Sequence, residues 1–81
     1  MLDKTFKIAD IYIPAGRRKD IDPEHVEEIA ESILKNGQLT PIMVRSDGQR
    51  YVLVEGLHRL EACKALGEET IVGVLVQARR R

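Results

Sequence analysis

The segment 51–59 constrains the fold of this chain more than any other, because it joins a strand to a helix through a single glycine. Residues 51–54 are Tyr-Val-Leu-Val, a hydrophobic run that is typical of a buried strand. Gly56 breaks the run, and a helix is predicted over 57–66, closed by Gly67. The chain therefore combines strands and helices within one short sequence.

The other elements are predicted from hydrophobic periodicity and turn residues. Asp22 is a good N-cap and Pro23 fits the first position of a helix, which Asn36-Gly37 stops. The expected strands are 8–13, 42–45, 50–55 and 71–77, with a basic loop at 15–21 and a hairpin turn at 46–49. The inward-facing residues should be Val26, Ile29, Ala30, Ile33 and Leu34 on the first helix, and Leu60, Cys63 and Leu66 on the second.

The resulting order is β-α-β-β-α-β, which predicts an α+β fold with a small mixed sheet and two main helices packed on it. With 81 residues the chain is expected to form a single domain over 1–81. Residues 78–81 are interpreted as a frayed tail or as the start of a further segment. Arg79–81 are read as solvated, with a nucleic-acid patch as the second interpretation.

Composition excludes several classes of protein. The formal net charge is +0, from 13 basic and 13 acidic residues, so a basic field over the whole domain is absent, and DNA binding should need a dimer or a larger chain. Cys63 is the only cysteine, which excludes an intramolecular disulfide and a cysteine-based metal site. No hydrophobic run is long enough for a signal peptide or a membrane span, so no membrane partner is expected and the cytoplasm is the expected location.

The glycine turn also predicts a binding site. The first turn of a helix has unpaired backbone N–H groups and a partial positive charge, and Gly56 allows close approach to the backbone. His58 and Arg59 add side-chain donors at the same place. This combination predicts a phosphate site.

The ordered motifs of the chain resemble the ParB/sulfiredoxin superfamily over nearly its whole length. The resemblance is carried by residues 11–14, the Arg17-Arg18 loop, Asp22-Pro23, and residues 30–33, 37–44, 51–62 and 66–67. It implies a nucleotide site in which the backbone of Gly56 and Leu57, with His58 and Arg59, holds the phosphates. Either Arg17 or Arg18 would reach in from the loop, Ser32 would face the phosphates, and Thr40-Pro41 would form the wall beside the base or ribose. His25 is interpreted as an exposed helix residue, or alternatively as a further phosphate contact.

Members of this superfamily differ in what they do at the turn, which here reads Glu-Gly-Leu-His-Arg. Partition proteins bind CTP and load onto DNA, sulfiredoxins use ATP and a cysteine, and free-serine kinases use ADP or ATP and a catalytic acid. Leu57 stands at the sulfiredoxin cysteine position and cannot form a thiolate, so sulfiredoxin activity is not expected. Cys63 is interpreted as a core residue.

The leading hypothesis is a ParB-like module that binds CTP or ATP with Mg²⁺. It would act in plasmid or chromosome partition or in transcriptional control, through self-association or a partner protein. A phosphotransferase of the serine-kinase type is the alternative, with Glu55 as the candidate catalytic acid and Asp20 as a second choice. Glu55 is also the candidate Mg²⁺ ligand. A catalytically inert interaction domain is the third hypothesis, and the sequence lacks the carboxylate cluster that a two-metal nuclease needs.

Overall fold

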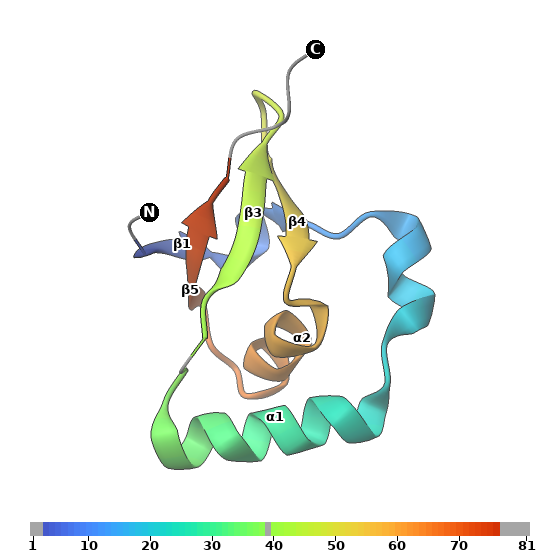
Figure 1. Ribbon diagram of the computed structural model, residues 1–81, viewed down its shortest axis with the longest axis vertical. Coiled ribbons are helices and arrows are strands. Elements are labelled where there is room, and N and C mark those ends of the chain that lie inside the picture. The colour runs from blue at the N-terminus through green and yellow to red at the C-terminus, as the bar shows by residue number, and fades with distance from the viewer. Residues whose placement is uncertain (1–2, 39, 77–81) are drawn as a thin grey trace.

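The computed structural model describes residues 3–38 and 40–76, which form one mixed five-stranded sheet and two α-helices (Figure 1). The α+β class, the mixed sheet and the two helices are as predicted. The strands are β1 (Asp3–Lys7), β2 (Ile11–Tyr12), β3 (Ile42–Ser46), β4 (Tyr51–Glu55) and β5 (Thr70–Leu75). The helices are α1 (Pro23–Asn36) and α2 (Leu57–Ala65), with 3-10 turns η1 (Ile8–Asp10) and η2 (Ala15–Asp20). The predicted tail, 78–81, lies outside the described residues.

The strand order across the sheet is β1-β5-β3-β4-β2. Strands β3 and β5 run parallel, as do β2 and β4, whereas the β1–β5 and β3–β4 pairs are antiparallel. Helix α2 packs against the sheet, and the two bury an aliphatic core with Phe6 as its one aromatic side chain among the fully buried described residues. The core consists of Phe6, Ile13, Ile42, Val44, Leu53, Leu57, Leu60, Cys63 and Ile71.

The prediction for the N-terminal strand was wrong over most of its length. Residues 8–10 form the turn η1, and within 8–13 only Ile11 and Tyr12 pair as a strand. The first strand is instead β1, which the hydrophobic pattern missed because Phe6 is its only buried residue. An edge strand with one covered face can carry charged residues at its other positions, so it lacks a strong hydrophobic signal.

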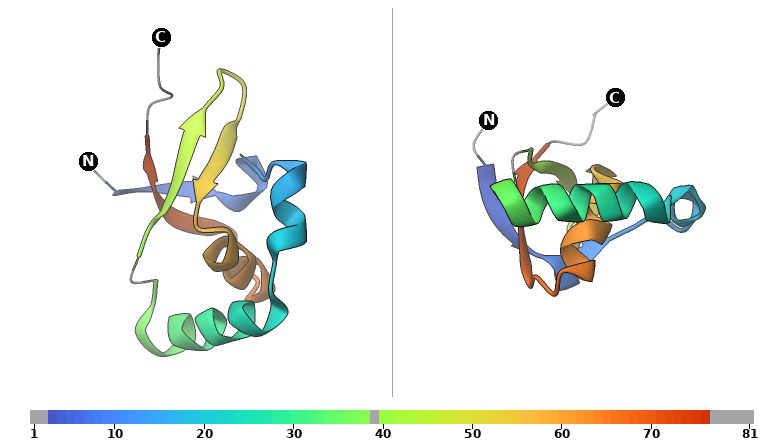
Figure 2. Two further views of the ribbon diagram at one scale, coloured as in Figure 1. Left: turned by 45° about the vertical axis from the view of Figure 1, so that its right-hand side comes forward. Right: turned by 90° about the horizontal axis from the view of Figure 1, so that it is seen from below.

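Helix α1 begins and ends as predicted, but it does not pack on the sheet. The Asp22 carboxylate accepts a hydrogen bond from the Glu24 N–H at 3.1 Å, and Gly37 ends the helix at φ +75°. Figures 1 and 2 show α1 crossing α2 on the side away from the sheet. It is therefore a third layer, and none of its residues is fully buried.

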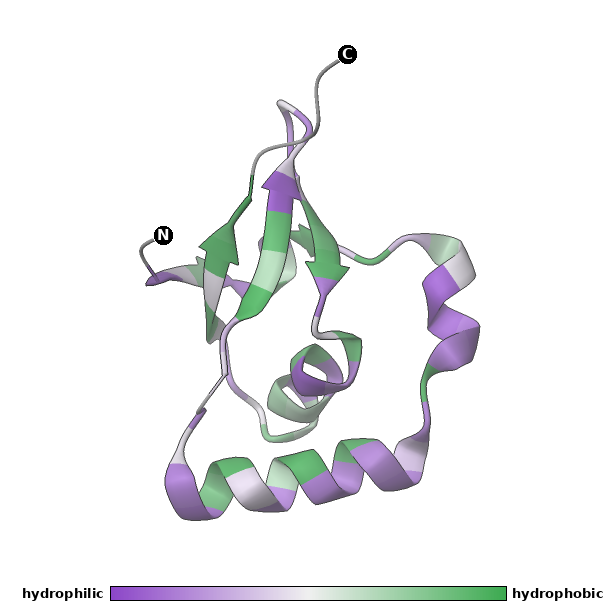
Figure 3. Cartoon of the chain, in the orientation of Figure 1, coloured by the Kyte–Doolittle hydropathy of each residue, from purple (hydrophilic) through white to green (hydrophobic). Residues whose placement is uncertain are grey.

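The position of α1 corrects one core prediction. Val26, Ile29, Ala30 and Ile33 are half-buried, but Leu34 is 73% exposed. A helix that rests on a single neighbouring helix covers only a narrow stripe, and Leu34 lies beyond its edge. On α2, Leu60 and Cys63 are buried as predicted and Leu66 is half-buried. Figure 3 shows β3, β4 and β5 as largely apolar and most of η2 as polar.

The C-terminal end of α1 is fastened to the sheet by the amide of Gln38. Its Oε1 accepts from the Val72 N–H at 2.8 Å, and its Nε2 donates to the carbonyls of Val72 at 2.8 Å and Thr40 at 2.9 Å. The side chain thus bonds to both backbone groups of Val72, as a neighbouring strand residue would.

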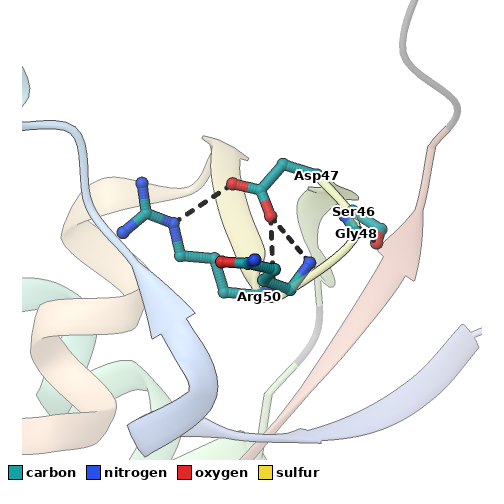
Figure 4. A network of polar contacts seen from close by, with 5 residues as sticks. Ser46, Asp47, Gly48 and Arg50 are labelled. Carbon is teal, nitrogen blue, oxygen red and sulfur yellow. Dashed lines mark hydrogen bonds and ion pairs between the residues drawn. The ribbon is translucent and has the colours of Figure 1, made fainter.

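The hairpin between β3 and β4 is held by Asp47, as Figure 4 shows. Its carboxylate accepts from the backbone N–H groups of Gln49 and Arg50, and from the Arg50 side chain at 3.2 Å. These bonds hold the pKa of Asp47 below its usual range, and the bond from the Gln49 N–H has the largest effect. Because the folded state lowers this pKa, the stabilisation is present above the ordinary pKa and is lost as the pH falls through the folded value.

No helix within the described residues is both long enough and apolar enough to cross a membrane.

Candidate functional site

Gly56, at the junction of β4 and α2, is required by the fold itself. Its φ is +107°, a conformation that residues with a side chain rarely adopt. A Cβ at this position would lie 2.6 Å from Cγ2 and 2.9 Å from Cβ of Ile42, which is completely buried. The space beside the glycine is therefore occupied by Ile42, so close packing within the protein explains the glycine in addition to any ligand.

The first turn of α2 leaves backbone donors available. The Leu60 N–H bonds to the Gly56 carbonyl, and no side chain of the described residues caps this helix. The N–H groups of Leu57, His58 and Arg59 precede that first helical bond and have no partner within the helix. The Leu57 side chain is buried in the core, so this residue can offer a ligand only its backbone.

A cavity of about 290 Å³ lies against this turn. It is open to solvent and is bordered by residues of η2, of the first two turns of α1 and of the start of α2. Its walls are formed by Arg17, Asp20, His25, Ile29, Gly56, Leu57, His58 and Arg59. The fold thus brings the predicted glycine turn together with one residue of the predicted arginine loop.

Arg17 and Arg18 are separated by the 3-10 geometry of η2. Arg17 is half-buried, lines the cavity, and donates from Nη1 to the Val54 carbonyl at 3.1 Å. A guanidinium has five N–H donors, so this bond leaves others for a ligand. Arg18 is exposed and does not line the cavity.

His58 connects α2 to α1. Its Nε2 accepts a hydrogen bond from the backbone N–H of Asp22 at 3.0 Å, so the ring is unprotonated at Nε2 and carries its proton on Nδ1. The ring also meets His25 edge-on, with the centroids 4.7 Å apart. In this conformation only the Nδ1–H of His58 is left to donate to a ligand.

This hydrogen bond makes a testable contribution to stability. We expect His58→Phe to lower the free energy of unfolding by about 1 kcal/mol, because the ring contact remains while the Asp22 N–H loses its acceptor. His25→Phe is the matched control, since it keeps the same ring contact and removes only a 3.6 Å contact with Glu28. Urea denaturation measures both variants, and equal losses would show that the bond to Asp22 contributes nothing.

Several residues singled out from the sequence are not among those that line the cavity. Ser32 and Thr40 are exposed and do not line it, and the same holds for Glu55, which precedes the glycine turn. Conversely, Ile29 lines the cavity although its helical spacing marked it only as a core residue. Asp20 and His25, which the sequence offered only as second choices, also form part of the wall.

The described residues hold no group of three or more His, Cys, Asp or Glu side chains that could bind a metal ion. Cys63 is buried as predicted, and burial, with a smaller effect of Glu68, raises the pKa of its thiol. A raised pKa disfavours the reactive thiolate. Cys63 therefore does not replace the cysteine that is absent at Leu57.

A larger cavity of about 530 Å³ lies at the opposite end of β4, between β2 and the hairpin. The one cationic side chain in its lining, Arg50, is already bound to Asp47 and stacked on Tyr12, with its guanidinium carbon 3.8 Å from the ring centroid. The cavity at the glycine turn is the better candidate for an anion, because it combines Arg17 and Arg59 with a helix N-terminus.

Comparisons with known proteins identify the family and the fold of the chain. The ParB N-terminal domain family matches residues 4–81. The stage 0 sporulation protein J of Bacillus subtilis is 37% identical over 73 residues, which are 89% of this chain and 26% of that protein. The chain thus spans about a quarter of the length of this relative.

Two solved structures share the fold. Sulfiredoxin from Arabidopsis thaliana superposes with a TM-score of 0.87 at 28% identity, covering 96% of this chain and 88% of that one. The chromosome-partitioning protein ParB of Caulobacter crescentus, complexed with CTP-gamma-S, gives a TM-score of 0.82 at 24% identity, covering 98% of this chain and 46% of that one. The resemblance in the sequence is confirmed, and the chain belongs to the ParB N-terminal domain family within the ParB/sulfiredoxin superfamily.

Proposed function

We propose that this chain is a nucleotide-binding module of a DNA-linked process such as chromosome or plasmid partition or transcriptional control. The observation that carries the proposal is the cavity at the glycine turn, where Arg17 and Arg59 lie beside an uncapped helix N-terminus. Unpaired N–H groups and guanidinium groups are the donors that bind phosphates in proteins. The phosphates are placed against the turn from Gly56 to Arg59, with Arg17 on the other side.

The cavity suits a phosphate chain better than an apolar ligand. Its polar groups come from three separate elements, and only Ile29 and the mostly buried Leu57 contribute apolar side chains. The described residues hold no cluster that could retain a metal ion alone, so Mg²⁺ would enter together with the nucleotide. Once bound, Mg²⁺ neutralises part of the phosphate charge.

CTP is the first nucleotide to test, since the Caulobacter ParB of the same fold was crystallised with a CTP analogue. ATP is the second, because Arg17 and the turn from Gly56 to Arg59 would contact the phosphates, which CTP and ATP share, and not the base. Ser32 and Thr40 remain predicted contacts for the nucleotide, and of the two arginines of η2 we assign the phosphate contact to Arg17 and none to Arg18. With a net charge of +0, binding to DNA is proposed to occur through a dimer or a larger chain.

The phosphotransferase hypothesis loses its first catalytic candidate, Glu55, although its second candidate, Asp20, does line the cavity. Glu55 is exposed and does not line the cavity, so it is not placed to take a proton from a hydroxyl group beside the phosphates.

Equilibrium binding of CTP and ATP with Mg²⁺, measured by calorimetry at low salt, tests the proposal. We expect one of the two nucleotides to bind, with an affinity that falls severalfold between about 0.05 and 0.5 M salt as the arginine charges are screened. Absence of binding for both nucleotides would contradict the proposal and favour an interaction domain that has lost its ligand.

A further inference from the structure

The carboxylate of Asp20 is unexpected in a site that is proposed to bind an anion. Of the described residues that line the cavity, it is the only one with a carboxylate, and the other charged residues there are Arg17 and Arg59. It ends η2, the turn that also carries Arg17. A negative charge in this position weakens the binding of a phosphate unless something positive lies between the two.

No described residue pairs with this carboxylate. Within residues 3–38 and 40–76, Asp20 forms no ion pair and its side chain accepts no hydrogen bond. Two other carboxylates of the described residues are engaged, that of Asp22 at the N-terminus of α1 and that of Asp47 in the hairpin at the opposite end of β4. Asp20 is exposed and open to the cavity, so its acceptor oxygens are available to a ligand.

One carboxylate beside a phosphate site is the usual protein contribution to a Mg²⁺-nucleotide site. Mg²⁺ keeps several waters and is held by one or two carboxylates plus the phosphates of the substrate, and not by a cage of protein side chains. The described part of the chain has no such cage, and it has one free carboxylate in the cavity. Both observations fit a metal that arrives already bound to phosphate.

We propose that Asp20 faces Mg²⁺, directly or through one of its waters, and makes the cavity select Mg²⁺-bound phosphates over metal-free phosphates. The inference rests on the proposed function and specifies the ligand of the same site. It also moves the metal-facing role from Glu55 to Asp20. Glu55 is exposed at the end of β4 and outside the cavity wall.

The experiment compares Asp20→Asn with the matched control Glu55→Gln. Both changes remove one negative charge from an exposed carboxylate with no partner in the described structure, so neither should affect folding. Calorimetry measures the affinity for pyrophosphate and for CTP, each with excess Mg²⁺ and each with a chelator in place of the metal.

In the unmodified chain the Mg²⁺ form is expected to bind more tightly than the metal-free form. Asp20→Asn should weaken the Mg²⁺ form and strengthen the metal-free form, each by about fivefold, because one charge interaction reverses sign between them. Glu55→Gln should leave the ratio of the two affinities unchanged.

Three results would overturn the inference. If Asp20→Asn shifts both forms in the same direction, or leaves their ratio unchanged, Asp20 does not face the metal while the nucleotide site stands. If Glu55→Gln instead removes the preference for the Mg²⁺-bound form, Glu55 and not Asp20 faces the metal. If the unmodified chain binds neither ligand in either form, the proposed function fails together with this inference.

Discussion

Gly56→Ala is expected to lower the free energy of unfolding by about 2–5 kcal/mol, which is the largest effect on stability that we predict. An alanine in the left-handed region costs about 1–2 kcal/mol, and overpacking of a filled core costs about 1–3 kcal/mol more. Here the added Cβ would lie 2.6 Å from the buried Ile42. Small domains have about 5 kcal/mol or somewhat more in total, so a loss at the upper end of this range would leave a large fraction of the variant unfolded.

Gly48→Ala separates the two causes. Gly48 has a similar φ of +97°, but a Cβ there would meet nothing within 4 Å. Gly48→Ala should lower the free energy of unfolding only by the cost of the left-handed backbone conformation, about 1–2 kcal/mol. Urea denaturation of both variants gives the difference, which reports the contact with Ile42. Equal losses would show that Ile42 moves aside at little cost.

The second large effect is expected on nucleotide affinity. Arg59→Ala and Arg17→Ala should each weaken binding by about 10- to 100-fold, since a hydrogen bond to a charged group contributes about 1.5–3 kcal/mol. Arg59 gives the cleaner measurement, because its side chain makes no hydrogen bond to any other described residue. Arg17 also donates to the Val54 carbonyl, so the folding of that variant is to be verified by circular dichroism.

Arg18→Ala is the matched control for both arginines. It removes the same charge, and from the same turn as Arg17, but Arg18 is exposed and lies outside the cavity wall. Its affinity should therefore change by less than about threefold, the effect of a partly screened distant charge. If Arg18→Ala and Arg17→Ala weaken binding equally, the arginines act only through a general field, and the geometry of η2 is irrelevant.

Local signals in the sequence were sufficient for much of the fold. The Asp22 cap, the stop at Asn36-Gly37 and the Asp47-Gly48 turn are each determined by neighbouring residues, and all three have the predicted geometry. Strand β1 was missed because only tertiary pairing with β5 makes a strand of its charged sequence. Leu34 was misplaced because periodicity does not tell how wide a surface the neighbouring element offers.

The sequence predicted a chain segment that borders the cavity, but not which side chains line it. The turn from Gly56 to Arg59 joins backbone and side-chain donors in one stretch of sequence, so its spacing alone was enough to predict a phosphate site there. The choice of Arg17 over Arg18 depends on the 3-10 turn η2, which the sequence suggested only as a loop. The place of Asp20 in the cavity wall could not be predicted for the same reason, because it is η2 that positions both Arg17 and Asp20 there.

The most direct test of a phosphate site at the glycine turn is an amide chemical-shift titration with CTP and then ATP, each with Mg²⁺. The largest shifts are expected at residues 56–59, with a second group at Arg17 and Asp20. Saturable shifts confined to other residues, such as Tyr12 and Arg50 at the opposite end of β4, would contradict it. So would the absence of any shift at the turn with both nucleotides.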